Sequence, residues 1–458
     1  MIGWIRAGRA VAAAAACAVG LGACAADRGD APTVAVALGD SFISGEGAQD
    51  FITGDGAADY AGTAPTPLFA VDNQTDPYFC HLSENALIEV ATLPGVDERL
   101  NLACSGAEPE DLLRANPDFV EVTGGLATQN VAPQLEQYWR ATAGKTVALV
   151  VVGLGANNAV NNFSGALGFC HAVFMADAAA GPAGRAAVNA VIEAYNDEDN
   201  TVFPSVQDAL ENNGCTATDF YSQAELNGIR DAYRDGLQQL IAGMRLRGYP
   251  AGSWKLVLHG YGSPFAPTPD ASFEREAGQT DADRRFRALA RERYAAGCPL
   301  HLETMRVADD LANTLSEIAQ DTAALLRAEF PGEDIVYLDV QRAFDGDRLC
   351  ERANSPAGAL FNPIWFRDAE NNEIQRELPQ VRTRPMAAQW ADLAEACANA
   401  DTGIFARCQD AAHPNANGHA ALARCLGQAV ALSNRQGGPS DIRCRRNAQT
   451  GAVSVEPF

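Results

Sequence analysis

TVAVALGDSFISGEG, residues 33–47, begins as a short apolar run and then changes abruptly to glycine, aspartate and serine. Such a run, closed by turn residues, is typical of a strand that is buried on both faces of a parallel sheet. In these sheets the binding and catalytic groups lie at the carboxyl ends of the strands. Ser41 follows the predicted strand directly, and the nearby glycines allow a tight turn. Taken alone, Gly-Asp-Ser fits a helix cap followed by turn glycines equally well.

Four further apolar runs are closed in the same way and predict strands at 100–103, 146–152, 254–259 and 334–340. Helical patterns occupy 129–142, 182–195, 223–246, 281–296, 306–330 and 415–432. This alternation predicts an α/β fold, with a doubly wound, flavodoxin-like parallel sheet of about five strands flanked by helices.

The stretches 160–253 and 261–333 are long for simple crossover connections, and we expect them to contain disulfide-bonded insertions that cap or wall the site. No linker rich in proline, glycine or serine divides the chain. The sequence therefore predicts a single domain over residues 33–458.

The composition of the 458-residue chain is that of a globular protein, with 47% hydrophobic and 20% charged residues. These fractions exclude wholesale disorder and a fibrous repeat. The net charge of −24 repels polyanions, so nucleic acid is a poor partner. Binding to an anionic membrane surface through charge alone is disfavoured for the same reason. We expect a monomer that acts on a neutral or cationic substrate.

The N-terminal residues predict an export signal. Arg6 and Arg9 precede an apolar stretch, 11–21, that is too short to span a bilayer as a mature helix. We therefore expect residues 1–23 to be a signal peptide. No later segment reaches about 18 uninterrupted apolar residues, so the sequence predicts no transmembrane helix.

The end of this signal, Leu-Gly-Ala-Cys at 21–24, resembles a bacterial lipobox. That resemblance implies cleavage before Cys24 and a lipid on its sulfur, which would be the protein's only attachment to a membrane. The alternative is an ordinary secretion signal, because Ala23-Cys24-Ala25 also satisfies the small-x-small rule. In both cases the protein leaves the cytoplasm, and residues 24–32 form a tether.

Cysteine usage agrees with export. Of the 12 cysteines, Cys17 lies in the signal and Cys24 at its edge, which leaves an even number. An even number in an exported chain predicts disulfide bonds. The remaining residues are Cys80, Cys104, Cys170, Cys215, Cys298, Cys350, Cys397, Cys408, Cys425 and Cys444.

Two more strand ends carry residues of interest. Gly106 follows the second predicted strand, and Asn157 follows the third in the sequence Gly-Leu-Gly-Ala-Asn-Asn. An asparagine at this place can direct its amide donor into a site. Taken singly, both residues also fit simple turns.

Near the C-terminus, Asp410 precedes His413 by three residues. An aspartate at this spacing can accept the Nδ1 proton of the imidazole and leave Nε2 free as a base. The alternative is a capping arrangement at a helix start. We interpret His419 as a packing or capping residue. The spacing of Cys397, Cys408 and the two histidines matches no common zinc site.

Gly-Asp-Ser, a glycine after the second strand, Gly-x-Asn after the third and a late Asp-x-x-His-Pro-Asn occur in this order. Together they resemble the four sequence blocks of the SGNH (GDSL-type) hydrolase superfamily. The stretches GDSFISGEG, NLACSGA, VVVGLGANN and HPNANGH are similar to its bacterial secreted esterase/lipase branch. The α/β-hydrolase motif Gly-x-Ser-x-Gly is absent, which disfavours that competing lipase fold.

The resemblance implies a role for each matched residue. Ser41 would be the nucleophile, His413 the general base and then acid, and Asp410 the residue that orients His413. The Ser41 amide, the Gly106 amide and the Asn157 side chain would form the oxyanion hole. It also implies an esterase or lipase that uses neither metal nor cofactor, with a small-molecule, lipid or glycan ester as substrate. The alternative is a catalytically silent surface protein that binds carbohydrate or lipid on the same fold.

Two positions depart from the family pattern: Asn158 stands where an aspartate is common, and Asp347 where a histidine is usual. The resemblance and the order of the cysteines imply the pairs Cys80–Cys104, Cys170–Cys215 and Cys298–Cys350. Proximity alone suggests Cys397–Cys408 and Cys425–Cys444.

Overall fold

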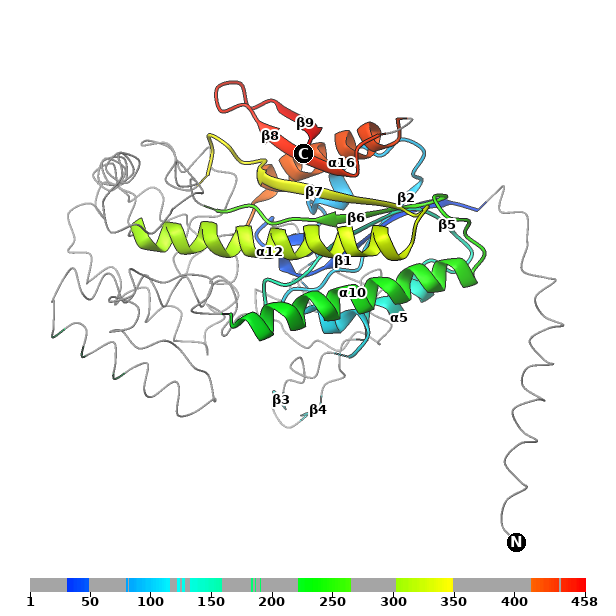
Figure 1. Cartoon of the computed structure of the whole chain (residues 1–458), viewed down its shortest axis with the longest axis horizontal. Coiled ribbons are helices and arrows are strands. Elements are labelled where there is room, and N and C mark those ends of the chain that lie inside the picture. Colours follow the sequence, from blue (N-terminus) through cyan, green and yellow to red (C-terminus); the bar gives the residue numbers. More distant parts are fainter. Residues whose placement is uncertain are drawn as a thin grey trace, which may run out of the picture.

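A computed structural model describes residues 31–48, 80, 82–115, 122–123, 126–127, 132–158, 183, 186, 190, 221–264, 302–348, 413–435 and 438–458. These residues form a seven-stranded sheet in the order β2-β1-β5-β6-β7-β8-β9 (Figure 1). The strands are β1 Thr33–Gly39, β2 Glu98–Asn101, β5 Thr146–Gly153, β6 Lys255–His259, β7 Asp334–Arg342, β8 Asp441–Arg446 and β9 Val453–Pro457. A separate short hairpin pairs β3 (Val122–Thr123) with β4 (Leu126–Ala127).

The five predicted strands are all present, and each pairs in parallel with its neighbours in the sheet. Their order, β2-β1-β5-β6-β7, is the flavodoxin-like order, so the predicted α/β class is confirmed. The chain moves from β1 outward to β2 and then returns to the other side of β1. The strand order therefore reverses between β1 and β5, and such a switch point is where open α/β sheets place their ligands.

The sheet has two more strands than the sequence predicted. β8 pairs in parallel with β7, and β9 pairs antiparallel with β8. In β8 only Ile442 and Cys444 are buried, and polar residues alternate with them. This edge segment has no continuous apolar run, which is the signal that identified the five central strands.

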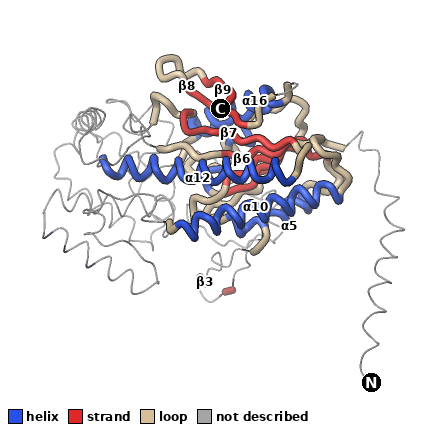
Figure 2. The backbone as a smooth tube through the Cα atoms, viewed as in Figure 1, coloured by secondary structure: helices blue, strands red, loops and turns tan. Residues whose placement is uncertain are grey.

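Helices cover the sheet (Figures 1 and 2). Helix α10 packs against α12, and α12 against β6 and β7, whereas α16 packs against α4, β7 and β8. The helices are α4 Leu87–Val90, α5 Gln134–Ala141, α10 Gln223–Leu246, α12 Leu302–Glu329 and α16 Ala416–Ser433. None of the described helices is long and apolar enough to cross a membrane.

Helix α10 has the bounds predicted from the sequence, and its ends show why. The Ser222 hydroxyl accepts a hydrogen bond from the Glu225 amide at 3.2 Å, and the Glu225 carboxylate accepts one from the Ser222 amide at 2.6 Å. This reciprocal pair satisfies donors that a helix start leaves open. After Leu246 the chain turns at Gly248, whose φ is +80°. A glycine in the left-handed region commonly ends a helix.

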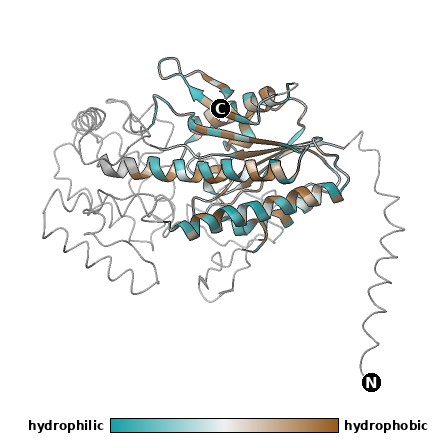
Figure 3. Cartoon of the chain, viewed as in Figure 1, coloured by the Kyte–Doolittle hydropathy of each residue, from teal (hydrophilic) through white to brown (hydrophobic). Residues whose placement is uncertain are grey.

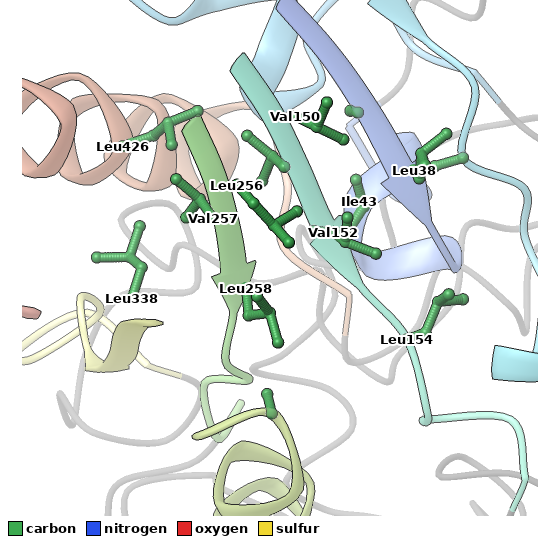
Figure 4. Close-up of a cluster of buried hydrophobic side chains, with 14 of the residues drawn as sticks. Leu38, Ile43, Val150, Val152, Leu154, Leu256, Val257, Leu258, Leu338 and Leu426 are labelled. Carbon is green, nitrogen blue, oxygen red and sulfur yellow. The ribbon is translucent and has the colours of Figure 1, made fainter. Parts of the chain in front are cut away.

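The apolar core lies between the helices and the sheet. Val34 to Leu38 of β1 are fully buried, as the sequence predicted for a central parallel strand. Figure 3 shows the hydrophobic strands inside, with polar stripes along the outer sides of α10 and α12. The close-up of Figure 4 labels Val257 of β6 and Leu426 of α16 among the side chains of one buried hydrophobic cluster.

Two of the predicted disulfides are present among the described residues. Cys80–Cys104 joins two segments near the end of β2, and Cys425–Cys444 joins α16 to β8. The pairs Cys170–Cys215, Cys298–Cys350 and Cys397–Cys408 lie outside the described residues, as do the predicted signal (residues 1–23) and Cys24. The described parts of the two predicted insertions include α10 and α12, which cover the sheet.

Candidate active site

Ser41 lies at the switch point, at the carboxyl end of β1. It is the first residue of the short helix α2, Ser41–Ser44. Asp40 has an extended backbone and caps this helix, because its Oδ1 accepts a hydrogen bond from the Phe42 amide at 3.0 Å. The cap holds the turn that presents Ser41, which is 6% exposed.

The turn before Ser41 has room only for glycine. A Cβ on Gly39 would lie 2.5 Å from the carbonyl oxygen of Gly153 on β5. The missing side chain therefore lets the ends of β1 and β5 approach each other two residues before Ser41. The Gly39 peptide is held from the side by Gln134 of α5, whose Oε1 accepts from the Gly39 amide at 2.9 Å. Its Nε2 donates to the Gly39 carbonyl at 2.8 Å.

His413 lies opposite Ser41. Its Nε2 is 2.9 Å from the Ser41 Oγ, although 372 residues separate the two in the chain. The imidazole precedes helix α16, whose first turn is capped by Asn415 accepting from the Gly418 amide at 3.1 Å. The distance between the two atoms suits proton transfer from the hydroxyl to the imidazole. Asp410, predicted to orient this histidine, lies outside the described residues.

The predicted oxyanion residues lie in two adjacent loops. Gly106 has a φ of +78°, in the turn that follows β2. Asn157 follows β5, and its Nδ2 donates to the carbonyl of Ala107 at 3.0 Å. The amide group of Asn157 has a second hydrogen, and no acceptor in the described part of the chain takes it up. The structure thus joins the Asn157 side chain to the Gly106 turn.

A buried carboxylate supports the Gly106 turn. The Ser105 hydroxyl donates a hydrogen bond to Glu46 Oε2, and the Glu46 residue is 1% exposed. The Ser105 amide donates to the Cys80 carbonyl at 3.2 Å, beside the Cys80–Cys104 disulfide. These contacts tie the Gly106 turn to the segment that follows Ser41.

The two residues that depart from the family pattern both have contacts. Asn158 donates from Nδ2 to Glu110 Oε2 at 3.3 Å, so it fastens the loop after β5 to the 3-10 helix Pro109–Leu112. Asp347 forms an ion pair with Arg446 of β8. Asn158 therefore links the loop that carries Asn157 to that 3-10 helix.

Asp40, which precedes Ser41, and the imidazoles of His259 and His419 are all buried. Burial raises the pKa of Asp40 to about 6, against the effect of its hydrogen bonds from Tyr261, Phe42 and Ala156. Burial lowers the pKa of His259 to about 4 and that of His419 to about 3. Both imidazoles are therefore neutral at pH 7. The His419 side chain is fully buried, which agrees with its interpretation as a packing residue.

Within the described ranges, no group of three or more histidine, cysteine, aspartate or glutamate side chains is placed to hold a metal ion. The arrangement at the switch point is instead that of a serine hydroxyl, an imidazole and adjacent amide donors, which is suited to acyl transfer.

Sequence patterns did not identify Gln134, Glu46 or Tyr261, each of which contacts the Ser41 turn or the Gly106 turn. Gln134 appears in the sequence as one polar residue of an amphipathic helix, and it lies 95 residues from its partner Gly39. Tyr261 lies 221 residues from Asp40. A local pattern carries no signal for contacts at such separations.

No protein-family model and no curated protein sequence matches the chain. Among solved structures, an extracellular lipase from Streptomyces rimosus is 15% identical, with a TM-score of 0.34. The match covers 84% of this chain and 94% of the lipase. A phospholipase A1 from Streptomyces albidoflavus NA297 is 16% identical, with a TM-score of 0.34 and coverage of 72% and 86%. The case for a function therefore rests on the geometry of the site.

Proposed function

We propose that the protein is an exported serine esterase of the SGNH type, which hydrolyses carboxylic esters through an acyl-enzyme on Ser41. The observation that carries this proposal is the 2.9 Å approach of His413 Nε2 to Ser41 Oγ at the switch point of the sheet. A buried serine turn that faces an imidazole is the arrangement by which enzymes activate a hydroxyl nucleophile.

The reaction follows from the positions of these groups. His413 Nε2 takes the hydroxyl proton as Ser41 Oγ attacks the ester carbonyl, and a tetrahedral oxyanion forms. The Ser41 amide, the Gly106 amide and the Asn157 side chain stabilise that charge. His413 then gives the proton to the leaving alcohol. Water then attacks the acyl carbonyl as His413 Nε2 takes its proton, the bond to Ser41 Oγ breaks, and His413 returns the proton to Oγ as the acid leaves.

Asp410 has a supporting role in this proposal. Three residues before His413, its carboxylate accepts the Nδ1 proton, holds the tautomer with Nε2 free and stabilises the imidazolium. The substrate is a small-molecule, lipid or glycan ester, and a neutral or cationic ester suits the net charge of −24.

Labelling with a fluorophosphonate probe tests the nucleophile directly. We expect the wild-type protein and a Ser253→Ala control to be labelled, and Ser41→Ala to remain unlabelled. Ser253 is an exposed serine whose hydroxyl donates to the Pro250 carbonyl, away from the site. If the folded wild-type protein is not labelled, the serine esterase proposal is wrong and the binding-protein alternative is favoured. A panel of p-nitrophenyl esters, acetylated xylan and phospholipids then identifies the ester.

The export part of the proposal has its own test. We propose that the signal is cleaved before Cys24 and that a lipid on its sulfur holds the protein at the cell envelope. A clickable fatty acid fed to expressing cells should label the wild-type protein, whereas Cys24→Ser should not be labelled. Equal labelling of both would contradict the anchor, and an unlabelled wild-type protein in the medium would show ordinary secretion.

A further inference from the structure

The carboxylate of Asp40 joins the ends of three neighbouring strands. Its Oδ1 accepts from the Phe42 amide in the turn after β1. Its Oδ2 accepts from the Ala156 amide after β5 at 3.3 Å, and from the hydroxyl of Tyr261 after β6. Asp40 is fully buried. One side chain therefore connects the Ser41 turn to the segment that carries Asn157.

Tyr261 is itself held firmly. Its amide donates to the Ser316 hydroxyl of α12 at 2.9 Å, and that hydroxyl donates to the Tyr261 carbonyl at 3.1 Å. Its ring lies tilted against Phe42, with 5.3 Å between the ring centroids, and the residue is 4% exposed. Helix α12 and β6 thus determine where the phenolic hydroxyl points.

We propose that Tyr261 is a positioning residue for the nucleophile: its hydroxyl holds the Asp40 carboxylate in the orientation that keeps Ser41 and Asn157 in register. This inference rests on the proposed esterase function and adds a residue that the four sequence blocks do not contain. Tyr261 acts only through Asp40 and does not touch the reacting atoms.

The chemistry of a buried carboxylate explains why this hydroxyl is needed. An ionised carboxyl group offers only acceptors, as the three donors around Asp40 require, whereas a protonated one uses one oxygen as a donor. Burial disfavours the ionised form and raises the pKa of Asp40 to about 6, and the Tyr261 hydrogen bond is the largest opposing effect. Without it the carboxyl group would stay protonated to a higher pH.

Tyr233, a second titratable group near Asp40, does not replace this hydroxyl. Tyr233 of α10 donates its hydroxyl to the Val152 carbonyl at 2.9 Å. Burial raises the pKa of both Tyr233 and Tyr261 well above 10, and the charge of Asp40 acts in the same direction. Both tyrosines are therefore neutral over the whole range in which Asp40 titrates.

The Tyr261→Phe variant tests the proposal, because it keeps the ring against Phe42 and removes only the hydroxyl. Tyr138→Phe is the matched control, since Tyr138 is equally buried and its hydroxyl contacts Met244 Sδ at 3.1 Å. For Tyr261→Phe we expect kcat on a soluble p-nitrophenyl ester, and the rate of fluorophosphonate labelling, to fall about tenfold with little change in KM. The acid limb of kcat/KM should move up by about one pH unit.

Stability supplies a readout that does not depend on activity. The free energy of unfolding that Tyr261→Phe loses should be larger at pH 8, where Asp40 is ionised, than at pH 4.5, where it is protonated. Tyr138→Phe should lose the same amount at both values. Chemical denaturation of both variants measures these losses, and it also shows whether each variant folds.

The outcomes separate the two ideas. In one outcome, the wild-type protein is active, whereas Tyr261→Phe keeps the same kcat and pH profile and loses the same stability at both pH values. That result would overturn the positioning role alone. A loss of kcat in Tyr261→Phe with no pH dependence would show a merely structural tyrosine and would also overturn it. A wild-type protein without labelling or hydrolysis would overturn the esterase proposal, and the inference with it.

Discussion

The side-chain amide of Gln134 makes two hydrogen bonds with the backbone of Gly39, the residue that ends β1 two positions before Ser41. Gln134 is 1% exposed, so neither the amide nor the peptide can exchange these bonds for water. The Gly39 carbonyl also accepts from the Cys104 amide at 2.9 Å. Helix α5 and the loop after β2 thus both hold Gly39, which directly precedes the Ser41 turn.

Replacement of Gln134 should therefore destabilise the protein. We expect Gln134→Ala to lower the free energy of unfolding by about 1–3 kcal/mol, because it leaves the buried Gly39 amide without an acceptor. Urea unfolding measures the loss. Gln239→Ala, at an exposed position on α10, should change stability by less than about 0.5 kcal/mol. Equal effects of the two substitutions would show that the Gln134–Gly39 hydrogen bonds contribute nothing to stability.

Removal of Ser41 or His413 should abolish ester hydrolysis. Because the two groups act as one unit, the double Ala variant should be barely worse than either single variant. The measurement is kcat/KM for all three proteins on one soluble ester. A Ser41→Ala protein that keeps a tenth of the wild-type activity would contradict its assignment as nucleophile.

Asn157→Ala should lower kcat by about 10² to 10³, the usual loss for one oxyanion donor, with a smaller effect on KM. The physical reason is that the donor meets full negative charge only in the transition state. Gln239→Ala, at the exposed position on α10, is the control and should leave kcat unchanged. If kcat is unchanged in Asn157→Ala, the residue is only part of a turn.

Ser105→Ala should weaken catalysis through the oxyanion loop. The substitution removes the hydrogen bond to Glu46 that holds the Gly106 turn, and we expect kcat to fall about tenfold with KM little changed. Ser253→Ala, at the exposed serine used above, should leave both constants unchanged. An unaltered kcat in Ser105→Ala would mean that the Cys80–Cys104 disulfide holds the turn without help.

Stability should fall with acidity because of the buried histidines. The folded-state pKa values of about 4 for His259 and about 3 for His419 lie below the ordinary 6.5. Between these values the unfolded chain binds more protons than the folded protein, so the free energy of unfolding decreases as pH falls from about 6.5 to about 3. The contribution of Asp40 to the free energy of unfolding has the opposite sign. Because its folded-state pKa is raised from 3.8 to about 6, that contribution increases as pH falls from about 6 to 3.8.

A variant isolates the histidine contribution. The free energy of unfolding of His419→Gln, measured by denaturation from pH 7 to pH 4, should decline less steeply than that of the wild-type protein. His259→Gln is the second informative variant, because burial also lowers the pKa of His259. Identical slopes in the wild-type protein and both variants would show that neither imidazole is held neutral in the fold.

Most of the fold could be predicted from the sequence, because the elements that build it have local causes. β1 and β5 are buried on both faces and appear as continuous apolar runs. Helix α10 has a capping box at one end and a glycine at the other. β8 was missed because its buried residues alternate with polar ones, so it has no such run. The predicted strands also put Ser41, Gly106 and Asn157 after the carboxyl ends of three of them.

The sequence by itself thus determined the α/β class, the five central strands and which residues to examine for a site. Only the tertiary structure decided that His413 meets Ser41 at 2.9 Å, that Gln134 holds Gly39 and that Tyr261 reaches Asp40. The physical reason is range: secondary structure follows from the spacing of neighbouring side chains, whereas these contacts join residues 95 to 372 positions apart. They exist only once the sheet has brought the strand ends together.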